Sequence, residues 1–336
     1  MNQEELIDAF VELGEVLSRP SSPLDEAIRQ SYLHNNWFTE ENSRLAIDAI
    51  VKKFLQKEKL NEWLDKYDFP KQKKEKNIGL VMAGNIPLVG FHDFLCVLLS
   101  GNIAQIKLSS KDKFLLPFLV GKLSAINPAF KKKIYFVELL KKMDAVIATG
   151  SNNSSRYFEY YFGKYPHIIR KHRNSAAVLS GRETSEELKL LGKDIFHYFG
   201  MGCRSVSKLF VPLDYDFKVF FPAIESFKSM IEHHKYKNNY DYNSTLLLMN
   251  KTPHLTNNFL ILVENKEMSS PIATLYYEHY KNEKELSGKL KASAEKIQCI
   301  VSHTSKQHIP FGQSQYPELW DYADGVDVMK FMKKVF

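Results

Sequence analysis

The chain has 336 residues, of which 44% are hydrophobic and 25% charged, and it carries a formal net charge of +7. These proportions are ordinary for a globular protein, and the length predicts one large or two medium domains. The longest strongly apolar stretches, such as 114–120, are shorter than the roughly 20 residues needed to cross a bilayer, so we expect no transmembrane segment. The first ten residues carry three acids and no basic region, which argues against a secretory signal.

The basic balance is compatible with nucleic acid, an anionic membrane surface, or a polyanionic small ligand such as a nucleotide or coenzyme A. Lysines gather within 71–76 and 131–133, and we interpret both clusters as solvated loops. No aromatic platform or zinc-finger spacing accompanies them, so nucleic acid is not an expected ligand. The cysteines number three and form no CxxC pair, which argues against disulfides and favours a reducing cytosol. We therefore expect a cytoplasmic protein.

Apolar periodicity predicts helices over the first 70 residues and an alternating pattern after them. The expected elements of the first part are strand 78–82, helix 92–99, strand 103–108, helix 115–125, strands 133–137 and 145–148, helix 156–162 and strand 176–179. Those of the second part are helix 185–197, strand 207–211, helix 217–233 and strands near 245–249, 259–262 and 297–301. Strands alternating with helices predict an α/β fold with a mostly parallel sheet.

Three predicted strands of the first part end in breaks at Asn85, Lys107 and Gly150. In parallel sheets covered by helices, ligands bind beyond the carboxyl ends of the strands. These three positions are therefore candidates for ligand contact.

Cys203 follows Phe199-Gly200-Met201-Gly202, between a predicted helix and a predicted strand. Glycines allow a tight turn there, and backbone amides at such a turn can stabilise both a thiolate and a developing oxyanion. A cysteine beside glycine is more often a small buried residue, so both interpretations stay open at this point. Cys96 and Cys299 lie in apolar segments and are interpreted as core.

Other polar candidates are weaker. His303 and His308 are five residues apart, a poor spacing for a metal, and no HExxH motif exists, so no metal site is expected. His92 and Asp93 are interpreted as a solvated helix start rather than a general base.

Five segments in the same order resemble the aldehyde dehydrogenase superfamily. The first is Gly200-Met201-Gly202-Cys203 followed by the run Ser207-Lys208-Leu209-Phe210-Val211-Pro212, which resembles the region of the nucleophilic cysteine. The other four are Gly84-Asn85-Ile86-Pro87, Ile106-Lys107-Leu108-Ser109, Thr149-Gly150-Ser151 and Glu267-Met268-Ser269-Ser270-Pro271. Together they span about residues 78–271.

The resemblance implies a role for each of these segments. Asn85 would donate to the oxyanion, Lys107 would reach the adenosine ribose, and Gly150 with Ser151 would lie under the cofactor pyrophosphate. Glu267 would hold the nicotinamide ribose. It also implies a helical segment 1–70 packing on an NAD(P)-binding domain over 71–198, and a smaller catalytic α/β domain over 199–336.

Two departures from the superfamily pattern are informative. The general-base glutamate is absent, and its place falls near Arg170 in Arg170-Lys171-His172-Arg173. Members that use coenzyme A lack this glutamate similarly. Ser110 stands where NAD-preferring relatives have a ribose-binding acid. A 2′-phosphate would then meet no like charge, and Lys107 with Lys111 could pair with it, so NADPH is favoured and NADH stays open.

The loop 83–90 and the tail segments 310–315 and 320–325 resemble acyl-CoA reductases of the luminescence fatty-acid-reductase type. This resemblance implies NADPH-dependent reduction of a fatty acyl-CoA to an aldehyde through a thioester on Cys203, with coenzyme A as part of the substrate. A protein partner that transfers the acyl group, and homo-oligomerisation, are compatible with it. The alternatives are an acyl-phosphate reductase of the same fold, and a basic nucleic-acid-binding protein in which the fold is degenerate.

Overall fold

The computed structural model describes residues 1–69 and 74–335, without the side chain at 152. The chain forms two compact units. One comprises residues 1–172 with 317–336, and the other comprises residues 173–316. Lys71, Lys73 and the predicted boundary after residue 70 lie outside the described residues. No helix of the described part is long and apolar enough to cross a membrane.

The first unit begins with the helices that the sequence predicts. They are α1 (Gln3–Ser18), α2 (Ser22–His34), α3 (Glu40–Phe54) and α4 (Lys57–Leu64). A capping box between Asn2 and Glu5 starts α1, which satisfies backbone N–H groups of the first turn. The apolar stripe of α1, including the fully buried Phe10 and Leu13, packs into the core of this unit.

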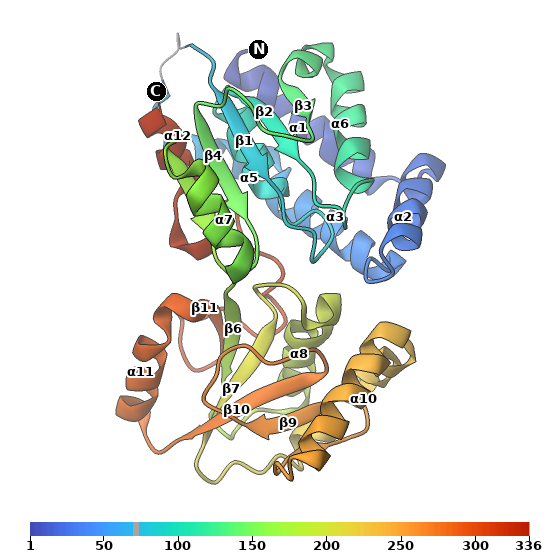
Figure 1. Cartoon of the computed structure of the whole chain (residues 1–336), viewed down its shortest axis with the longest axis vertical. Helices are drawn as coiled ribbons and strands as arrows, with labels where there is room; N and C mark the ends of the chain where they lie inside the picture. The colour runs from blue at the N-terminus through green and yellow to red at the C-terminus, as the bar shows by residue number, and fades with distance from the viewer. Residues whose placement is uncertain (70–73, 336) are drawn as a thin grey trace. The chain divides into compact units, whose positions relative to one another are not determined.

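A five-stranded parallel sheet forms the centre of the first unit. Its strands are β1 (Asn77–Val81), β2 (Ile103–Lys107), β3 (Ile134–Phe136), β4 (Ala145–Thr149) and β5 (His167–Arg170), in the order β3-β2-β1-β4-β5. Helices α5 (Phe91–Leu99), α6 (Leu115–Ile126) and α7 (Asn152–Phe162) and the short helix η1 (Pro128–Lys132) connect them. Figure 1 shows α7 on one face and α5, α6 and α1 on the other. The strand order reverses beside β1, where open α/β sheets bind ligands.

The second unit contains a six-stranded sheet in the order β11-β6-β7-β10-β9-β8. Its strands are β6 (Asn174–Val178), β7 (Val206–Pro212), β8 (Leu255–Thr256), β9 (Ile261–Glu264), β10 (Thr274–Tyr280) and β11 (Ile297–Val301), parallel except for the β8–β9 pair. Its helices are α8 (Ser185–Phe196), η2 (His197–Gly200), α9 (Phe220–Ala223), η3 (Glu225–Glu232), α10 (His234–Met249), α11 (Glu283–Ala292) and η4 (Ala294–Lys296). The α/β class with a second, smaller α/β unit is confirmed.

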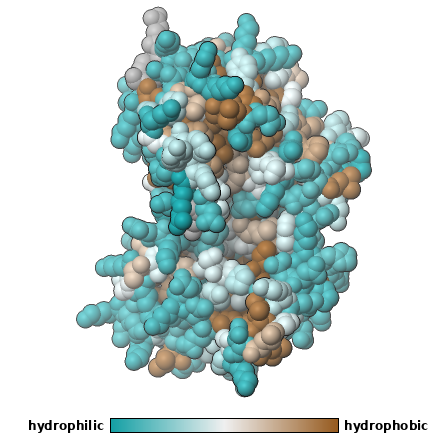
Figure 2. All heavy atoms as spheres, in the orientation of Figure 1, coloured by the Kyte–Doolittle hydropathy of each residue, from teal (hydrophilic) through white to brown (hydrophobic). Residues whose placement is uncertain are grey.

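The C-terminal residues return to the first unit. They form η5 (Ala323–Gly325) and α12 (Val328–Val335), and Met329 and Met332 are fully buried in its core. The indole Nε1 of Trp63 donates to the Tyr322 hydroxyl at 2.7 Å. The visible face of each unit is mainly hydrophilic with separate small apolar patches, as expected when the apolar residues fill interior cores (Figure 2).

Two predicted elements differ in the structure. The strand expected near 245–249 is wrong, because these residues complete α10, with Leu248 and Met249 largely exposed. A short apolar run does not by itself distinguish a strand from a helix. The helix expected over 217–233 is divided into α9 and η3, with a break at Ile224. Pro222 lies in the first turn of α9 and disfavours helix before it, which fits a start at Phe220 rather than at 217.

The division into compact units also differs from the boundaries given by the sequence. The change comes at 172/173 rather than 198/199, because β6 pairs with β7 and β11 of the second sheet. Elements without a counterpart among the predicted ones include β5, β8, β10, α11 and α12.

Candidate active site

Cys203 lies at the tip of a tight turn in the second unit. The residues that lead into it, Tyr198, Phe199 and Gly200, all have left-handed backbone with φ of 55°, 57° and 75°. Two successive non-glycine residues in this region are uncommon and store strain, which is typical of functional sites. The Ser205 N–H then donates to the Gly202 carbonyl at 2.9 Å, and the Gly202 N–H donates back to Ser205 Oγ at 3.2 Å. Cys203 is therefore fixed between them.

The three cysteines differ in how far their side chains are exposed, and this difference bears on which of them can react. Cys96 is buried, and burial raises the pKa of its thiol well above the ordinary value, so it is inert core as expected. Cys203 is partly exposed, which favours the nucleophile interpretation over that of a small buried residue. Cys299 is also partly exposed rather than core, and its Sγ lies 3.0 Å from Ser175 Oγ.

Three side-chain hydrogen bonds connect this turn to other segments of the second unit. Ser175 Oγ, on β6, donates to the Cys203 carbonyl at 3.0 Å. Gln315 Nε2 donates to Ser205 Oγ at 3.1 Å, and Arg204 Nε donates to the Ser314 carbonyl at 2.5 Å. The tail segment 312–315 thus forms a strap over the residues that follow the cysteine.

The strap is anchored on a buried carboxylate of α8. Asp194 accepts from the Gly312 N–H at 2.6 Å and from the Ser314 N–H at 2.9 Å. Burial raises the pKa of Asp194 to about 6, against the opposing effect of these two donors. Gly312 has a φ of 80°, a conformation that favours glycine. Sequence analysis missed Asp194, Ser175 and Gln315 as site residues; the only signal was the resemblance of the 310–315 tail.

Asn85 lies in the loop between β1 and α5 of the first unit and is partly exposed. A Cβ built on Gly84 would lie 2.5 Å from Ser109 Oγ, so glycine is required where this loop meets the loop after β2. Leu88 has a φ of 56°, and its N–H donates to Asp112 Oδ2 at 3.0 Å. The Asn85 loop is thereby attached to Asp112, a residue that sequence analysis missed.

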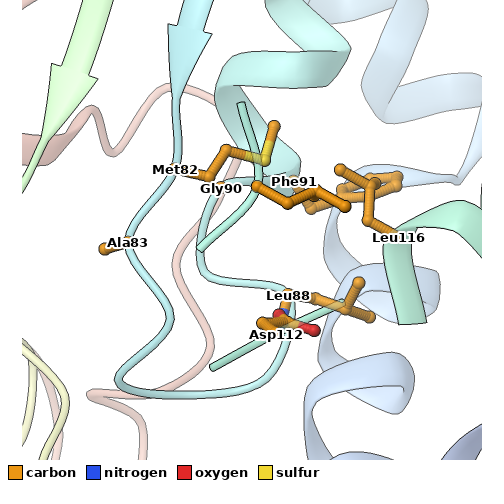
Figure 3. Close-up of a pocket in the computed structure, with 8 residues that line it drawn as sticks. Met82, Ala83, Leu88, Gly90, Phe91, Asp112 and Leu116 are labelled. Atoms are coloured by element: carbon orange, nitrogen blue, oxygen red, sulfur yellow. The ribbon is translucent and has the colours of Figure 1, made fainter. Parts of the chain in front are cut away.

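Asp112 and Leu88 line a small cavity beneath this loop, together with Met82, Phe91 and Leu116 (Figure 3). Its volume of about 10 Å³ is the space of one water molecule, too small for a substrate. Asp112 Oδ1 is buried without a hydrogen-bond partner among the described residues. Burial raises the pKa of Asp112 to about 6.

The candidate cofactor residues of the first unit follow strands of the same sheet. Lys107 is the exposed last residue of β2, and Ser110 is exposed in the turn that follows. His34 Nε2 lies 2.6 Å from the Ser110 carbonyl and donates to it, so the end of α2 supports this turn. The 107–111 turn carries an exposed lysine and no exposed acid. Its charge therefore favours binding of a phosphate over binding of an unphosphorylated ribose.

Gly150 and Ser151 join β4 to α7. A Cβ on Gly150 would lie 2.8 Å from the Phe158 ring, so the backbone approaches the helix closely there. Ser151 caps α7 by accepting from the Ser154 N–H at 3.2 Å, and the first turn of α7 holds no acid. A helix N-terminus of this kind suits an anionic group such as a pyrophosphate.

The structure thus gathers the candidates in two sets. The first set lies at or just after the carboxyl ends of strands, at one edge of the first sheet, and comprises Asn85, Lys107, Ser110, Gly150 and Ser151. Cys203 and Glu267 belong to the second unit, where Cys203 precedes β7 and Glu267 lies in the loop between β9 and β10. The Glu267 carboxylate is exposed and lies 3.6 Å from Lys296 Nζ.

Arg170, which the resemblance places near the missing glutamate, forms a buried ion pair. Arg170 ends β5, is buried, and binds Asp93 of α5 through its two terminal nitrogens, Nη1 and Nη2, with 2.8 Å between Nη2 and Oδ1. The interpretation of His92 and Asp93 as a solvated helix start is wrong for Asp93, because this side chain is buried and paired with Arg170. No group of three or more metal-binding side chains occurs within the described ranges.

Comparison with solved structures identifies the class of this fold. A variant of an aldehyde dehydrogenase from Bacillus cereus is 13% identical with a TM-score of 0.65, over 90% of this chain and 72% of that one. Aldehyde dehydrogenase 21 from Physcomitrella patens is 11% identical with a TM-score of 0.63, over 98% and 87%. The Mycobacterium tuberculosis aldehyde dehydrogenase, solved with NAD+, is 10% identical with a TM-score of 0.64, over 90% and 73%. The fold is that of the aldehyde dehydrogenases.

The family follows from the sequence. Residues 22–219, more than half of the chain, match the family of acyl-CoA reductases called LuxC. The chain belongs to this family and is an aldehyde-forming acyl-CoA reductase. The matched range contains Asn85, Lys107, Gly150 and Cys203, whereas Glu267 lies beyond it. No curated protein matches the sequence.

Proposed function

We propose that the protein reduces a fatty acyl-CoA to the aldehyde with NADPH, through a thioester on Cys203. The observation that carries the proposal is the partly exposed Cys203 at the tip of a strained, strapped turn in a chain of the acyl-CoA reductase family. A nucleophile that forms a covalent intermediate divides one difficult reduction into two easier steps.

In the first step the Cys203 thiolate attacks the acyl carbonyl carbon. The Asn85 side-chain amide and the Cys203 backbone N–H donate to the oxyanion, and losing one such donor typically costs about 3 kcal/mol of transition-state stabilisation. The C–S bond to coenzyme A then breaks, and coenzyme A leaves as a thiolate. Because one thioester replaces another, the exchange is close to thermoneutral.

The cofactor is nicotinamide-based, and NADPH supplies a hydride to the acyl carbon when bound. Lys107 and the Ser110 turn would hold the adenosine 2′-phosphate, and Gly150 with Ser151 would hold the pyrophosphate. Glu267 would orient the nicotinamide ribose. The exposed lysine and the acid-free N-terminus of α7 support this assignment, and so does the NAD+ bound in the structurally similar M. tuberculosis enzyme.

In the last step the thiohemiacetal on Cys203 collapses. Its C–S bond breaks, the aldehyde leaves, and Cys203 returns to the thiolate. We expect slow hydrolysis of the thioester, because the resemblance puts Arg170 in place of the water-activating glutamate and its partner Asp93 is engaged in the ion pair.

A substrate and cofactor panel tests this function. Single-turnover aldehyde formation would be measured with fatty acyl-CoAs of several lengths and with an acyl phosphate, each with NADPH or NADH. The proposal expects aldehyde from acyl-CoA, fastest with NADPH. Aldehyde from the acyl phosphate alone would contradict it and favour the acyl-phosphate alternative.

A further inference from the structure

The Glu267 segment is held from both sides by two consecutive residues of β7. Ser207 Oγ donates to the Met268 carbonyl at 2.6 Å, and Lys208 Nζ donates to the Asn265 carbonyl. The Glu267 N–H donates to Asn265 Oδ1 at 2.9 Å. The backbone on either side of Glu267 is therefore fixed, although its carboxylate is exposed.

Both holding residues lie in the interior of the second unit. Ser207 is 5% exposed and Lys208 is 0% exposed. A buried ammonium is destabilising unless it is paired and hydrogen-bonded. Glu278 of β10 supplies the pairing charge at 3.0 Å from Lys208 Nζ, and Lys289 also contacts that carboxylate at 2.5 Å.

These contacts give a structural role to Ser207 and Lys208, which have no part in the proposed mechanism. Ser207 and Lys208 begin the run that follows the nucleophile in the sequence, and their side chains bind the Met268 and Asn265 carbonyls. The Lys208 ammonium pairs with Glu278 of the sheet and also donates to the Asn265 carbonyl of the loop. The buried lysine therefore connects the sheet to the loop.

We propose that Ser207 and Lys208 are positioning residues that set the place of Glu267 for the cofactor, an inference that rests on the proposed role of Glu267. The strand that starts just after the nucleophile thereby also fixes the segment that orients the nicotinamide ribose. Loss of either contact would allow the 265–268 segment to move while the Cys203 turn, held by Ser175 and the 312–315 strap, keeps its contacts.

The gentlest test is Ser207→Ala, with Ser43→Ala as a matched control. Ser43 is also buried, and its Oγ donates to the Phe38 carbonyl at 3.3 Å in the first unit. In Ser207→Ala we expect acylation of the enzyme by acyl-CoA without nucleotide to stay within about twofold of wild type. Discharge of the acyl-enzyme by NADPH should slow by about tenfold, as for one lost hydrogen bond to a positioned segment. Ser43→Ala should change neither rate.

A structural readout accompanies the kinetics. Hydrogen exchange of the 265–268 amides should speed up in Ser207→Ala, and also in Lys208→Met if that variant folds. Unchanged exchange and unchanged discharge in Ser207→Ala would overturn the proposal, as would a loss of acylation equal to the loss of discharge. If wild type neither acylates nor binds NADPH, the proposed function fails, and the exchange rates alone then decide whether Ser207 positions the segment.

Discussion

The guanidinium of Arg170 and the carboxylate of Asp93 form a buried, two-bond ion pair between the end of β5 and the first turn of α5. Only 5% of Arg170 and 8% of Asp93 is exposed. Both carboxylate oxygens face the guanidinium, so Asp93 is not available as a proton acceptor for water. The resemblance puts Arg170 in place of the superfamily's general base, and the carboxylate that Arg170 binds is already engaged.

We therefore predict that the acyl-enzyme survives in water and is discharged by NADPH. A positioned general base typically accelerates hydrolysis about 10²–10⁴-fold, and the resemblance puts Arg170 rather than a carboxylate in its place. The measurement is a single-turnover chase of labelled acyl-enzyme with and without NADPH, following free acid and aldehyde. Free acid released as fast as aldehyde would contradict the prediction, and repeating the chase with His172→Ala would show whether that imidazole acts as the base.

The strap over the nucleophile turn predicts a specific loss in Gln315→Ala. Removing the amide deprives Ser205 Oγ of one of its two donors, so the turn that presents Cys203 should loosen and acylation by acyl-CoA should slow by about three- to tenfold. Gln313→Ala is the matched control, because Gln313 is an exposed neighbour in the same segment. Equal acylation rates in both variants would show that the strap does not position the turn.

Ser110→Glu should weaken NADPH binding. An added carboxylate in the exposed 107–111 turn would repel the 2′-phosphate, and at an exposed site this amounts to about five- to tenfold in the dissociation constant. Ser110→Gln has nearly the same shape without the charge and should bind NADPH close to wild type. Titration of nucleotide fluorescence measures both. If the wild-type enzyme binds NADH and NADPH equally well, and Ser110→Glu binds NADPH as tightly as the wild type does, the 107–111 turn is not part of the cofactor site.

Asp112 predicts a pH dependence of stability. Its pKa is 3.8 when unperturbed and about 6 in the fold, so the folded chain holds the extra proton between these values. The free energy of unfolding should therefore fall as pH rises from about 4 to 6, by up to about 3 kcal/mol from this group. Asp112→Asn has no such proton, so relative to wild type it should gain that amount between pH 4 and pH 7.5. Urea unfolding at both pH values measures it, and parallel pH profiles would refute the assignment.

The first sheet was largely predictable because its strands are continuous apolar runs ended by glycine, asparagine or lysine. These ends also located Asn85, Lys107 and Gly150 at one edge of the sheet, since parallel strands end together. The 245–249 segment shows the opposite case. The prediction assumed that its apolar side chains are buried, but they lie on the surface of a helix.

The supports of the site could not be predicted, because they join residues far apart in the chain. Asp194 meets Gly312 across 118 residues, and Lys208 meets Asn265 across 57. Nothing in the local sequence around an aspartate or a lysine shows which distant backbone group it will satisfy. The Ser207-Lys208 run was visible as a motif, but its action on the Glu267 segment required the fold.

The central claim is that Cys203 carries the acyl group, and peptide mass spectrometry after incubation with fatty acyl-CoA, without nucleotide, tests it most directly. We predict one adduct of acyl mass on the peptide that contains Cys203, absent in Cys203→Ser and retained in Cys299→Ser, the other partly exposed cysteine. An adduct that persists in Cys203→Ser, or that lies on Cys299 in the wild-type chain, would contradict the account.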